Sequence, residues 1–410
     1  MEKNQPPYQD SPPKPPSLLD YYGLIDDNCP SENDSSVRTL ELEDALSHLG
    51  LYSPPSHCQR PLTPPGFSGQ KRSDRGNAPI DNSNGDKGKP ISHLPQLTPF
   101  VDSLSLGDLR GQIFYLSKNA YGSHLLKKLI MKDPKEDEIE MVLSDMINHV
   151  SKLMRDRYGN YVIQEIFKVC NEKQRTRIIA SLTQSRSQFI KICHNQYGAR
   201  AVLVLLDHIS SQQQISLFMS ALSPGAAALA NDPNGHFIIR HCLQNFSGDD
   251  NKGEYRVHLF AEIIANALHL AQDRHGNFVV QLLLELGIAE VTENLLGQLG
   301  GSYLALSRKK FSSRVVERCL RKAGEEQASW IILELLTSPN ICALLVDPFG
   351  NFVIQTALEV SQGVIRRALF NLVQLNAHVM HSNLFGKRVL ALFNDLKLQH
   401  DSPFESKTLL

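Results

Sequence analysis

An internal repeat is the feature that most constrains how this chain can fold. From about residue 100 onward, a small residue returns every 36 to 41 positions, just ahead of an apolar run with helical spacing. A period of this length is typical of a solenoid, in which each unit buries its apolar face against its neighbours. The eight copies are centred on Gly122, Gly159, Gly198, Gly235, Gly276, Ser312, Gly350 and Gly386.

Each copy has the pattern of two main helices. The first is apolar at helical spacing, as in residues 138–147 and 330–336, and the second begins at the repeated small residue, as in residues 160–167. No strand-like alternation competes with this pattern, so we expect an all-α solenoid. In four copies a carboxylate precedes the small residue by three positions and can accept from the N–H groups of the first turn: Asp156, Asp232, Asp273 and Asp347.

A polar triplet follows the small residue at one fixed register. Its members are a polar residue at position i, a planar side chain at i+1 and a carboxamide or carboxylate at i+4. Core packing gives no reason to repeat such a polar pair, whereas i and i+4 lie on the same face of a helix and can converge on one flat ligand. The intact triplets are Asn160/Tyr161/Gln164, Asn277/Phe278/Gln281, Ser313/Arg314/Glu317 and Asn351/Phe352/Gln355.

The chemistry of these triplets suits a nucleotide base. Carboxamides offer donors and acceptors that match the edge of uracil, and a carboxylate accepts from the N1–H and N2–H₂ groups of guanine. A planar side chain at i+1 can stack on the base, which contributes about 1–3 kcal/mol per base. We therefore interpret each triplet as a site for one base, with the first and third residues at its edge and the second on its face.

The other four copies depart from this pattern. The first has Ser123/His124/Lys127, the third Ala199/Arg200/Leu203, the fourth His236/Phe237/Arg240 and the last Lys387/Arg388/Ala391. Leu203 cannot form a hydrogen bond, so we expect the third copy to stack through Arg200 and to discriminate little between bases. We expect edge contacts from Ser123, Lys127, His236 and Arg240, and stacking by His124, Phe237 and Arg388.

The N-terminal part of the chain is of a different kind. Of the 22 prolines in the chain, 16 lie at or before Pro99, among many Asp, Ser, Asn and Gly residues. Such a composition cannot bury enough apolar surface to offset chain entropy, so we expect residues 1–97 to be disordered, with a short helix at 37–51. We expect residues 98–400 to form the repeat domain and residues 401–410 a short tail.

Charge and cysteine content narrow the classes of function. Residues 1–99 hold 9 Lys and Arg against 13 Asp and Glu, which leaves a balance of only +3 on the remaining residues, so RNA binding has to depend on local placement of Arg and Lys rather than on a strongly basic domain. Seven cysteines without a C-x-x-C pair indicate a reduced, intracellular protein. The N-terminus has no signal peptide and the chain has no long apolar run, so we expect a cytoplasmic protein without contact to a membrane. Enzyme motifs are absent, and we expect no enzyme, metal or cofactor.

The eight copies resemble the repeats of the Pumilio-homology (PUF) family over residues 100–396. The resemblance implies a right-handed, crescent-shaped α-solenoid that binds one base per repeat, with the 5′ end of the RNA at the last repeats. It implies that Asn with Gln selects uracil and Ser with Glu selects guanine, which gives the site 5′-x-U-G-U-x-x-U-x-3′. It also implies a monomer that binds mRNA 3′ untranslated regions and represses translation or promotes decay, with repressor or deadenylase partners.

Two alternatives remain open at the level of the sequence. An armadillo- or HEAT-like scaffold has a similar period but has no need of the polar triplets. A PUF-like ribosome-assembly factor would carry more basic residues and fewer intact triplets. Selection of RNA in vitro by residues 95–410 would decide between an mRNA regulator and a scaffold.

Overall fold

The computed structural model describes residues 104–245 and 253–401. Throughout these residues the regular secondary structure is helical, without a strand. The chain divides into two compact units, Met1–Gln112 and Ile113–Leu410. In the first, the described part holds one 3₁₀ helix, η1 (Gly107–Leu109); in the second, it holds helices α4 to α26. The predicted disordered region 1–97, its helix at 37–51 and residues 402–410 of the tail lie outside the described residues.

The first seven repeats contain three helices each and the described part of the eighth contains two, where the sequence predicted two main helices in every repeat. The triplet lies on the helices that we call triplet helices: α5 (Ala120–Ile130), α8 (Gly159–Val169), α11 (Gln196–Asp207), α14 (Gly235–Asn245), α17 (Gly276–Glu285), α20 (Ser312–Lys322), α23 (Gly350–Val360) and α26 (Leu384–Asp401). A short helix precedes each of them: α4 (Ile113–Ser117), α7 (Val150–Met154), α10 (Arg186–His194), α13 (Ala226–Ala230), α16 (Ala267–Gln272), α19 (Tyr303–Ser307), α22 (Ile341–Leu344) and α25 (Ala377–His381).

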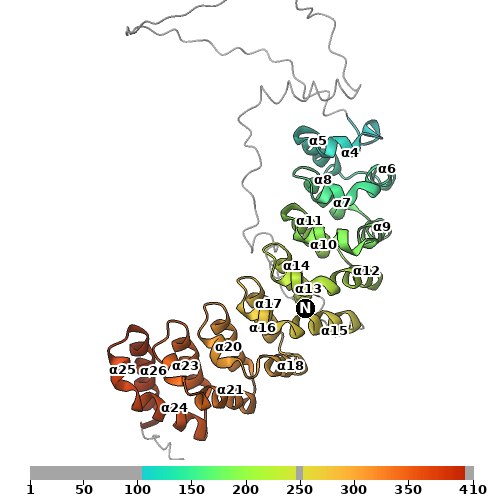
Figure 1. Cartoon of the computed structure of the whole chain (residues 1–410). Helices are drawn as coiled ribbons and strands as arrows, with labels where there is room; N and C mark the ends of the chain where they lie inside the picture. The colour runs from blue at the N-terminus through green and yellow to red at the C-terminus, as the bar shows by residue number, and fades with distance from the viewer. Residues whose placement is uncertain (1–103, 246–252, 402–410) are drawn as a thin grey trace, which may run out of the picture. The chain divides into compact units, whose positions relative to one another are not determined.

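A third set, the flanking helices, follows the triplet helices along the chain. These are α6 (Glu136–Met146), α9 (Glu172–Thr183), α12 (Gln212–Leu222), α15 (Gly253–Ala265), α18 (Ala289–Leu299), α21 (Glu325–Thr337) and α24 (Gly363–Leu375), with 3₁₀ turns η2 (Ile147–His149) and η3 (Ser223–Gly225) after α6 and α12. Figure 1 shows α8, α11 and α14 on one side of the stack and α9, α12 and α15 on the other, with the short helices between. The expected all-α solenoid of helical repeats is confirmed.

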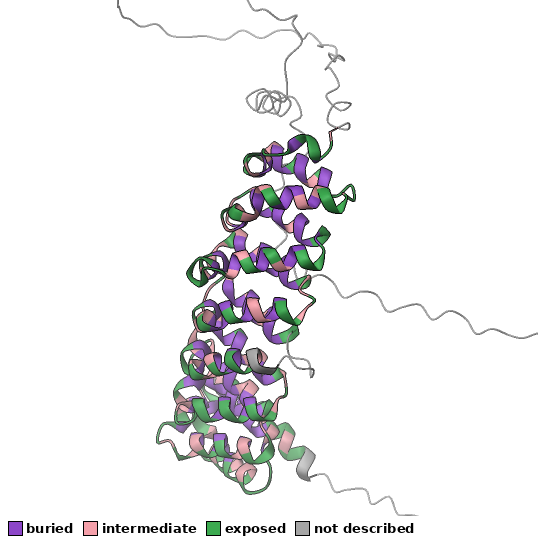
Figure 2. Cartoon of the chain, turned by 90° about the vertical axis from the view of Figure 1, so that its right-hand side faces the viewer, coloured by how far each residue is buried: buried purple, intermediate pink, exposed green. Residues whose placement is uncertain are grey.

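Neighbouring triplet helices pack against one another in an unbroken row from α5 to α26. The apolar residues within and just after each triplet are buried on these helices: on α17, for example, Val279, Val280, Leu283 and Leu284 are fully buried. Burial of one such side chain stabilises the fold by about 1.5–3 kcal/mol. Buried residues run through successive repeats in Figure 2, so the core is continuous along the stack.

Close packing explains the small residue at the start of the triplet helix. A Cβ atom on Gly198 would lie 2.3 Å from the carbonyl oxygen of Ile192, and one on Gly122 would lie 2.4 Å from that of Leu116. The backbone of the preceding short helix therefore leaves no room for a side chain. In the sixth repeat Ser312 accommodates its side chain by donating its hydroxyl to the carbonyl of Leu306, at 2.7 Å.

The predicted capping of the triplet helices is confirmed. The Oδ1 atom of Asp273 accepts from the backbone N–H groups of His275 and Gly276, at 2.7 and 2.8 Å. Burial raises the pKa of Asp273, but these N–H groups outweigh it and the pKa lies below its usual value. Asp156, Asp232 and Asp347 accept the same pair of bonds in their repeats.

Candidate nucleic-acid interface

The three positions of the triplet differ in exposure in the same way from repeat to repeat. The first residue is buried in seven repeats, the exception being Lys387. The second is exposed in six repeats and half-buried at Arg200 and Phe237. The third is half-buried in six repeats, buried at Leu203 and exposed at Ala391. The row of triplet helices thus presents one ring or guanidinium per repeat, and in six repeats a polar group at half depth lies beside it.

The buried asparagines are anchored to the backbone. The Nδ2 atom of Asn160 donates to the carbonyls of Asp156 and Arg157, both at 2.9 Å. In the fifth repeat, Asn277 Nδ2 donates to Asp273 and Arg274 at 2.8 and 3.0 Å. Asn351 Nδ2 donates to Asp347 at 2.8 Å. Since a carbonyl only accepts, each asparagine has to point its NH₂ group toward the backbone and its Oδ1 toward the third triplet residue.

Each glutamine is held by the asparagine of its own triplet. The Nε2 atoms of Gln164, Gln281 and Gln355 donate to the asparagine Oδ1 at 2.9, 3.0 and 3.0 Å. Within the described part of the chain, the three Oε1 atoms accept no hydrogen bond. The glutamine, more than the asparagine, therefore carries the polar atoms that are available to a ligand. From the sequence, both side chains were expected to contact the base edge equally.

Exposed rings lie beside these pairs. Tyr161, Phe278 and Phe352 are 37%, 43% and 41% exposed, which is unusual for large apolar groups on well-packed helices. In the first two repeats, Lys127 Nζ lies 6.0 Å from the centroid of the Tyr161 ring. At the other end, the Arg388 guanidinium lies 5.9 Å from the centroid of the Phe352 ring. At both places a cation of one repeat thus lies near the exposed ring of the neighbouring repeat.

The sixth repeat presents a different pair. Ser313 is buried, and its hydroxyl forms no hydrogen bond in the described residues, while Glu317 lies at half depth. Burial raises the pKa of the Glu317 carboxyl, and the nearby Arg321, Arg314 and Arg318 oppose this shift. Glu285 pairs with Arg318 and Lys322 at 2.7 Å, and Glu359 with Arg321 at 2.8 Å. The surplus positive charge of α20 is thus partly balanced at its C-terminal end.

In the fourth repeat, His236 replaces the asparagine. Its Nδ1 lies 2.8 Å from the carbonyl oxygen of Asp232, the position that asparagine Nδ2 contacts in other repeats. Nδ1 must carry the proton of this bond, so in the neutral ring Nε2 is an acceptor. Burial lowers the pKa of His236, and the nearby His275 and Arg240 lower it further, which keeps the ring neutral. The His236 ring also lies 3.9 Å from the Phe237 ring, centroid to centroid.

The other degenerate repeats lack this polar pair. Ala199 and Leu203 are buried, so Arg200 is the member of the third triplet that reaches the surface. In the first repeat the Ser123 hydroxyl donates to the carbonyl of Ala120 at 2.9 Å, and Lys127 pairs with Glu165 at 3.7 Å. Lys387, Arg388 and Ala391 are all exposed on α26.

Three further residues that cap triplet helices were not predicted from the sequence. Asn119, Asn195 and Asn383 stand three residues before the repeated glycine and accept from the same two N–H groups as the aspartates do. An Asp-or-Asn rule at this position would have found them. Lys309 occupies it in the sixth repeat. Among the described residues no cluster of His, Cys, Asp and Glu could hold a metal ion, and no helix there is long and apolar enough to cross a membrane.

Comparison with known proteins identifies the repeat. The model of the Pumilio-family RNA binding repeat matches residues 112–145, 149–183, 226–252, 266–299, 302–336 and 340–373. The matched segments begin at or near the short helices, so the short, triplet and flanking helices together form one unit. The third and eighth copies, whose triplets depart furthest from the pattern, lie outside the matched segments.

Curated relatives share the repeat region. Pumilio homolog 12 of Arabidopsis thaliana is 34% identical over 324 residues, which cover 72% of this chain and 54% of the relative. Pumilio homolog 9 of the same plant is 36% identical over 321 residues, covering 71% of this chain and 56% of the relative. The chain thus spans little more than half the length of these relatives.

Solved structures share the fold. A Puf4 mutant bound to a Cox17 RNA 3′ UTR recognition sequence superposes with a TM-score of 0.60 at 20% identity, over 72% of this chain and 98% of that one. The Puf4 RNA binding domain bound to an HO endonuclease RNA 3′ UTR recognition sequence gives a TM-score of 0.51 at 24% identity, over 69% and 98%. Repeats, relatives and fold agree, and the chain belongs to the Pumilio (PUF) family.

Proposed function

We propose that this protein binds single-stranded RNA in a sequence-specific manner, one base per repeat, and recognises UGU-containing elements. The observation that carries the proposal is the identical geometry of three repeats: a backbone-anchored asparagine, a glutamine held by it and an exposed ring. Such a site is pre-organised, so binding a base costs little further ordering of side chains.

Uracil matches the atoms that the glutamine leaves available. Gln281 Oε1 can accept the N3–H of uracil, and Nε2 has a second N–H for a uracil carbonyl. In the RNA-free chain Nε2 also lies 3.3 Å from the Asn277 carbonyl oxygen, a weak contact that is easily exchanged. Phe278 would stack on the base. The same reasoning applies to Asn160/Tyr161/Gln164 and Asn351/Phe352/Gln355.

Guanine matches the sixth repeat. When ionised, the Glu317 carboxylate can accept both the N1–H and the N2–H₂ of guanine, and Arg314 can stack on the base. Ser313 is small and leaves room for a purine. With the family's strand polarity, the seventh, sixth and fifth repeats recognise U, G and U, and the second adds a further U toward the 3′ end.

The proposed biological role is supported by the solved structures that have a similar fold. The solved neighbours are bound to 3′ UTR recognition sequences. We therefore place the action of this protein on mRNA 3′ untranslated regions in the cytoplasm, where it represses translation or promotes decay through repressor or deadenylase partners.

An exchange of triplet residues tests the mechanism. The double substitution Ser313→Asn with Glu317→Gln should convert the sixth repeat to the uracil type. We expect binding to shift from a UGU to a UUU target, with a change in relative affinity of about 1–3 kcal/mol. Fluorescence anisotropy with matched short RNAs measures it.

The reciprocal exchange is the control. Asn277→Ser with Gln281→Glu should make the fifth repeat prefer guanine while the sixth keeps its preference. Equal affinities of either variant for its old and new targets would refute one-base recognition. Selection of RNA in vitro on the full chain adds an independent check: recovery of sequences without UGU would favour a different RNA-related role.

A further inference from the structure

A cavity lies between two flanking helices, α18 and α21. Its volume is about 670 Å³. Leu296, Tyr303 and Ile331 contribute buried apolar surface, and Trp330 lines it with a side chain that is 65% exposed. Neither helix carries a triplet. In Figure 1 both lie on the opposite side of the stack from the triplet helices α17 and α20. The cavity is therefore separate from the proposed RNA site.

The cavity has room for a large side chain. A Cβ atom built on Gly297 would have nothing within 4 Å, so the wall formed by α18 is open at this point. Leu333, on the same helix as Trp330, is 40% exposed. Two large apolar side chains exposed around a concave site are characteristic of a surface that binds another molecule.

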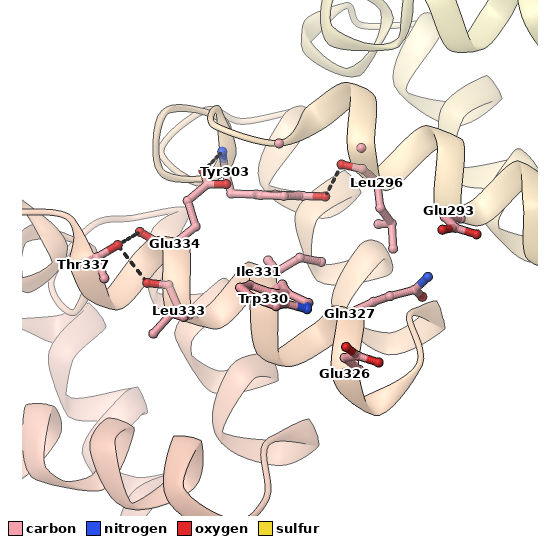
Figure 3. Close-up of a pocket in the computed structure, with 12 residues that line it drawn as sticks. Glu293, Leu296, Tyr303, Glu326, Gln327, Trp330, Ile331, Leu333, Glu334 and Thr337 are labelled. Atoms are coloured by element: carbon pink, nitrogen blue, oxygen red, sulfur yellow. Dashed lines mark hydrogen bonds between the residues drawn. The ribbon is translucent and has the colours of Figure 1, made fainter.

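The charges around the cavity have one sign. Glu293, Glu326 and Glu334 line it, without a Lys, Arg or His among the lining residues. The Glu334 carboxylate is engaged, because it accepts from the backbone N–H groups of Gly301 and Tyr303, both at 2.8 Å. The carboxylates of Glu293 and Glu326 make no hydrogen bond or ion pair in the described residues. Figure 3 shows them toward the same end of the cavity, near Gln327.

We propose that this cavity binds a short peptide segment of a partner protein that combines a bulky apolar side chain with an adjacent Arg or Lys. The apolar side chain packs on Trp330 in the space over Gly297. The cation lies at the Glu293 and Glu326 end of the cavity. There it pairs with the two carboxylates and remains within reach of the face of the Trp330 ring. An apolar centre with a charged rim is the arrangement found at interaction hot spots. The same carboxylates repel the phosphates of RNA.

The test uses the full chain and two matched pairs of variants. Gly297→Leu places a large side chain in the cavity from a position where a Cβ atom meets nothing within 4 Å, and it replaces glycine by a better helix former, so we expect the fold to be retained. Gly297→Ala improves the helix without filling the cavity. Glu326→Lys reverses the charge at the rim, and Glu325→Lys makes the same change at an exposed neighbour that does not line the cavity.

The probe is a displayed library of random short peptides, selected on the full chain and counter-selected on the Gly297→Leu variant. The enriched peptide is then synthesised and titrated. Since Trp330 is the single tryptophan of the chain, its fluorescence reports occupancy of this cavity directly.

We expect the enriched peptides to share a bulky apolar residue next to Arg or Lys. Their binding should change Trp330 emission saturably and weaken at least about tenfold in Gly297→Leu and Glu326→Lys, but not in Gly297→Ala or Glu325→Lys. RNA affinity should be equal in all four variants. Three results would overturn the proposal: no enriched sequence, enriched peptides without a cation, or a Trp330 already shielded from acrylamide in the peptide-free chain. The last would mean that a segment of this chain or a second copy occupies the cavity.

Discussion

At the scale of single residues, the anchoring of the first triplet position sets what a repeat can recognise. The side-chain NH₂ groups of Asn160, Asn277 and Asn351 donate to backbone carbonyls, and the asparagines thereby orient the glutamine. Their role is to position the group that contacts the base. His236 makes the equivalent bond with an imidazole, and the second nitrogen of its neutral ring is an acceptor in place of a carboxamide. The fourth repeat therefore keeps the anchor of the uracil type while its edge chemistry changes.

The anchor of the fourth repeat makes stability depend on pH. Burial lowers the pKa of folded His236 below its ordinary value of 6.5, so the unfolded chain binds the proton more readily. The stability that this neutral ring contributes is present above about pH 6.5 and is lost as the pH falls through the folded pKa. His236→Asn keeps an N–H for the Asp232 carbonyl and does not titrate. We expect the loss of melting temperature between about pH 7.5 and 5.5 to be smaller in this variant.

Thermal unfolding followed by circular dichroism at several pH values measures the effect. His378→Asn, at an exposed position on α25, controls for the removal of a histidine. An unchanged pH dependence in His236→Asn would show that the buried imidazole is not responsible.

At the scale of helices, the start of each triplet helix is determined by its approach to the short helix before it. The repeated glycine reflects this contact more than any turn geometry, because Cβ atoms at Gly122 and Gly198 would overlap backbone carbonyls. The short helices were missed in the sequence because they hold only four to nine residues, too few for a clear period. The triplet helices were found because their pattern is longer and recurs eight times.

Two glycines in helices should respond in opposite ways to alanine. At Gly198 the new Cβ atom would lie 2.3 Å from the Ile192 carbonyl oxygen, so the helices must separate and stability should fall by about 1–3 kcal/mol. At Gly297 the space is open, and the gain in helix propensity should raise stability by about 0.5–1 kcal/mol. Urea denaturation measures both. A Gly198→Ala variant as stable as the parent would show that the short and triplet helices can separate without cost.

At the scale of the whole molecule, the near-neutral charge has a consequence for binding. The net charge is −1, and Arg318, Arg321 and Lys322 are paired to glutamates, so the chain has no large excess of positive charge to attract phosphates. Affinity must then come mainly from stacking and from hydrogen bonds to base edges, neither of which releases counterions.

We therefore expect a weak dependence of RNA binding on salt. Each phosphate neutralised on a single strand contributes a slope of about −0.7 to log K against log salt. One contact in each of eight repeats would give about −5.6, and we expect a much shallower slope. Replacement of Phe278 by alanine should lower the affinity by about 1–3 kcal/mol at every salt concentration, without changing the slope. Anisotropy titrations between about 50 and 200 mM salt measure both quantities; a slope near −5 would show that phosphate contacts dominate.

The sequence alone determined the properties that depend on local spacing. The repeat period, the register of the triplets and the capping of their helices follow from relations between residues three or four positions apart, which a helix converts directly into contacts. The tertiary structure decided what depends on neighbouring elements. Packing against the short helices requires the glycines, burial commits the asparagine donors to the backbone, and α18 and α21, whose lining residues extend from Glu293 to Thr337, meet to form a cavity. Such contacts join residues whose proximity no local pattern encodes.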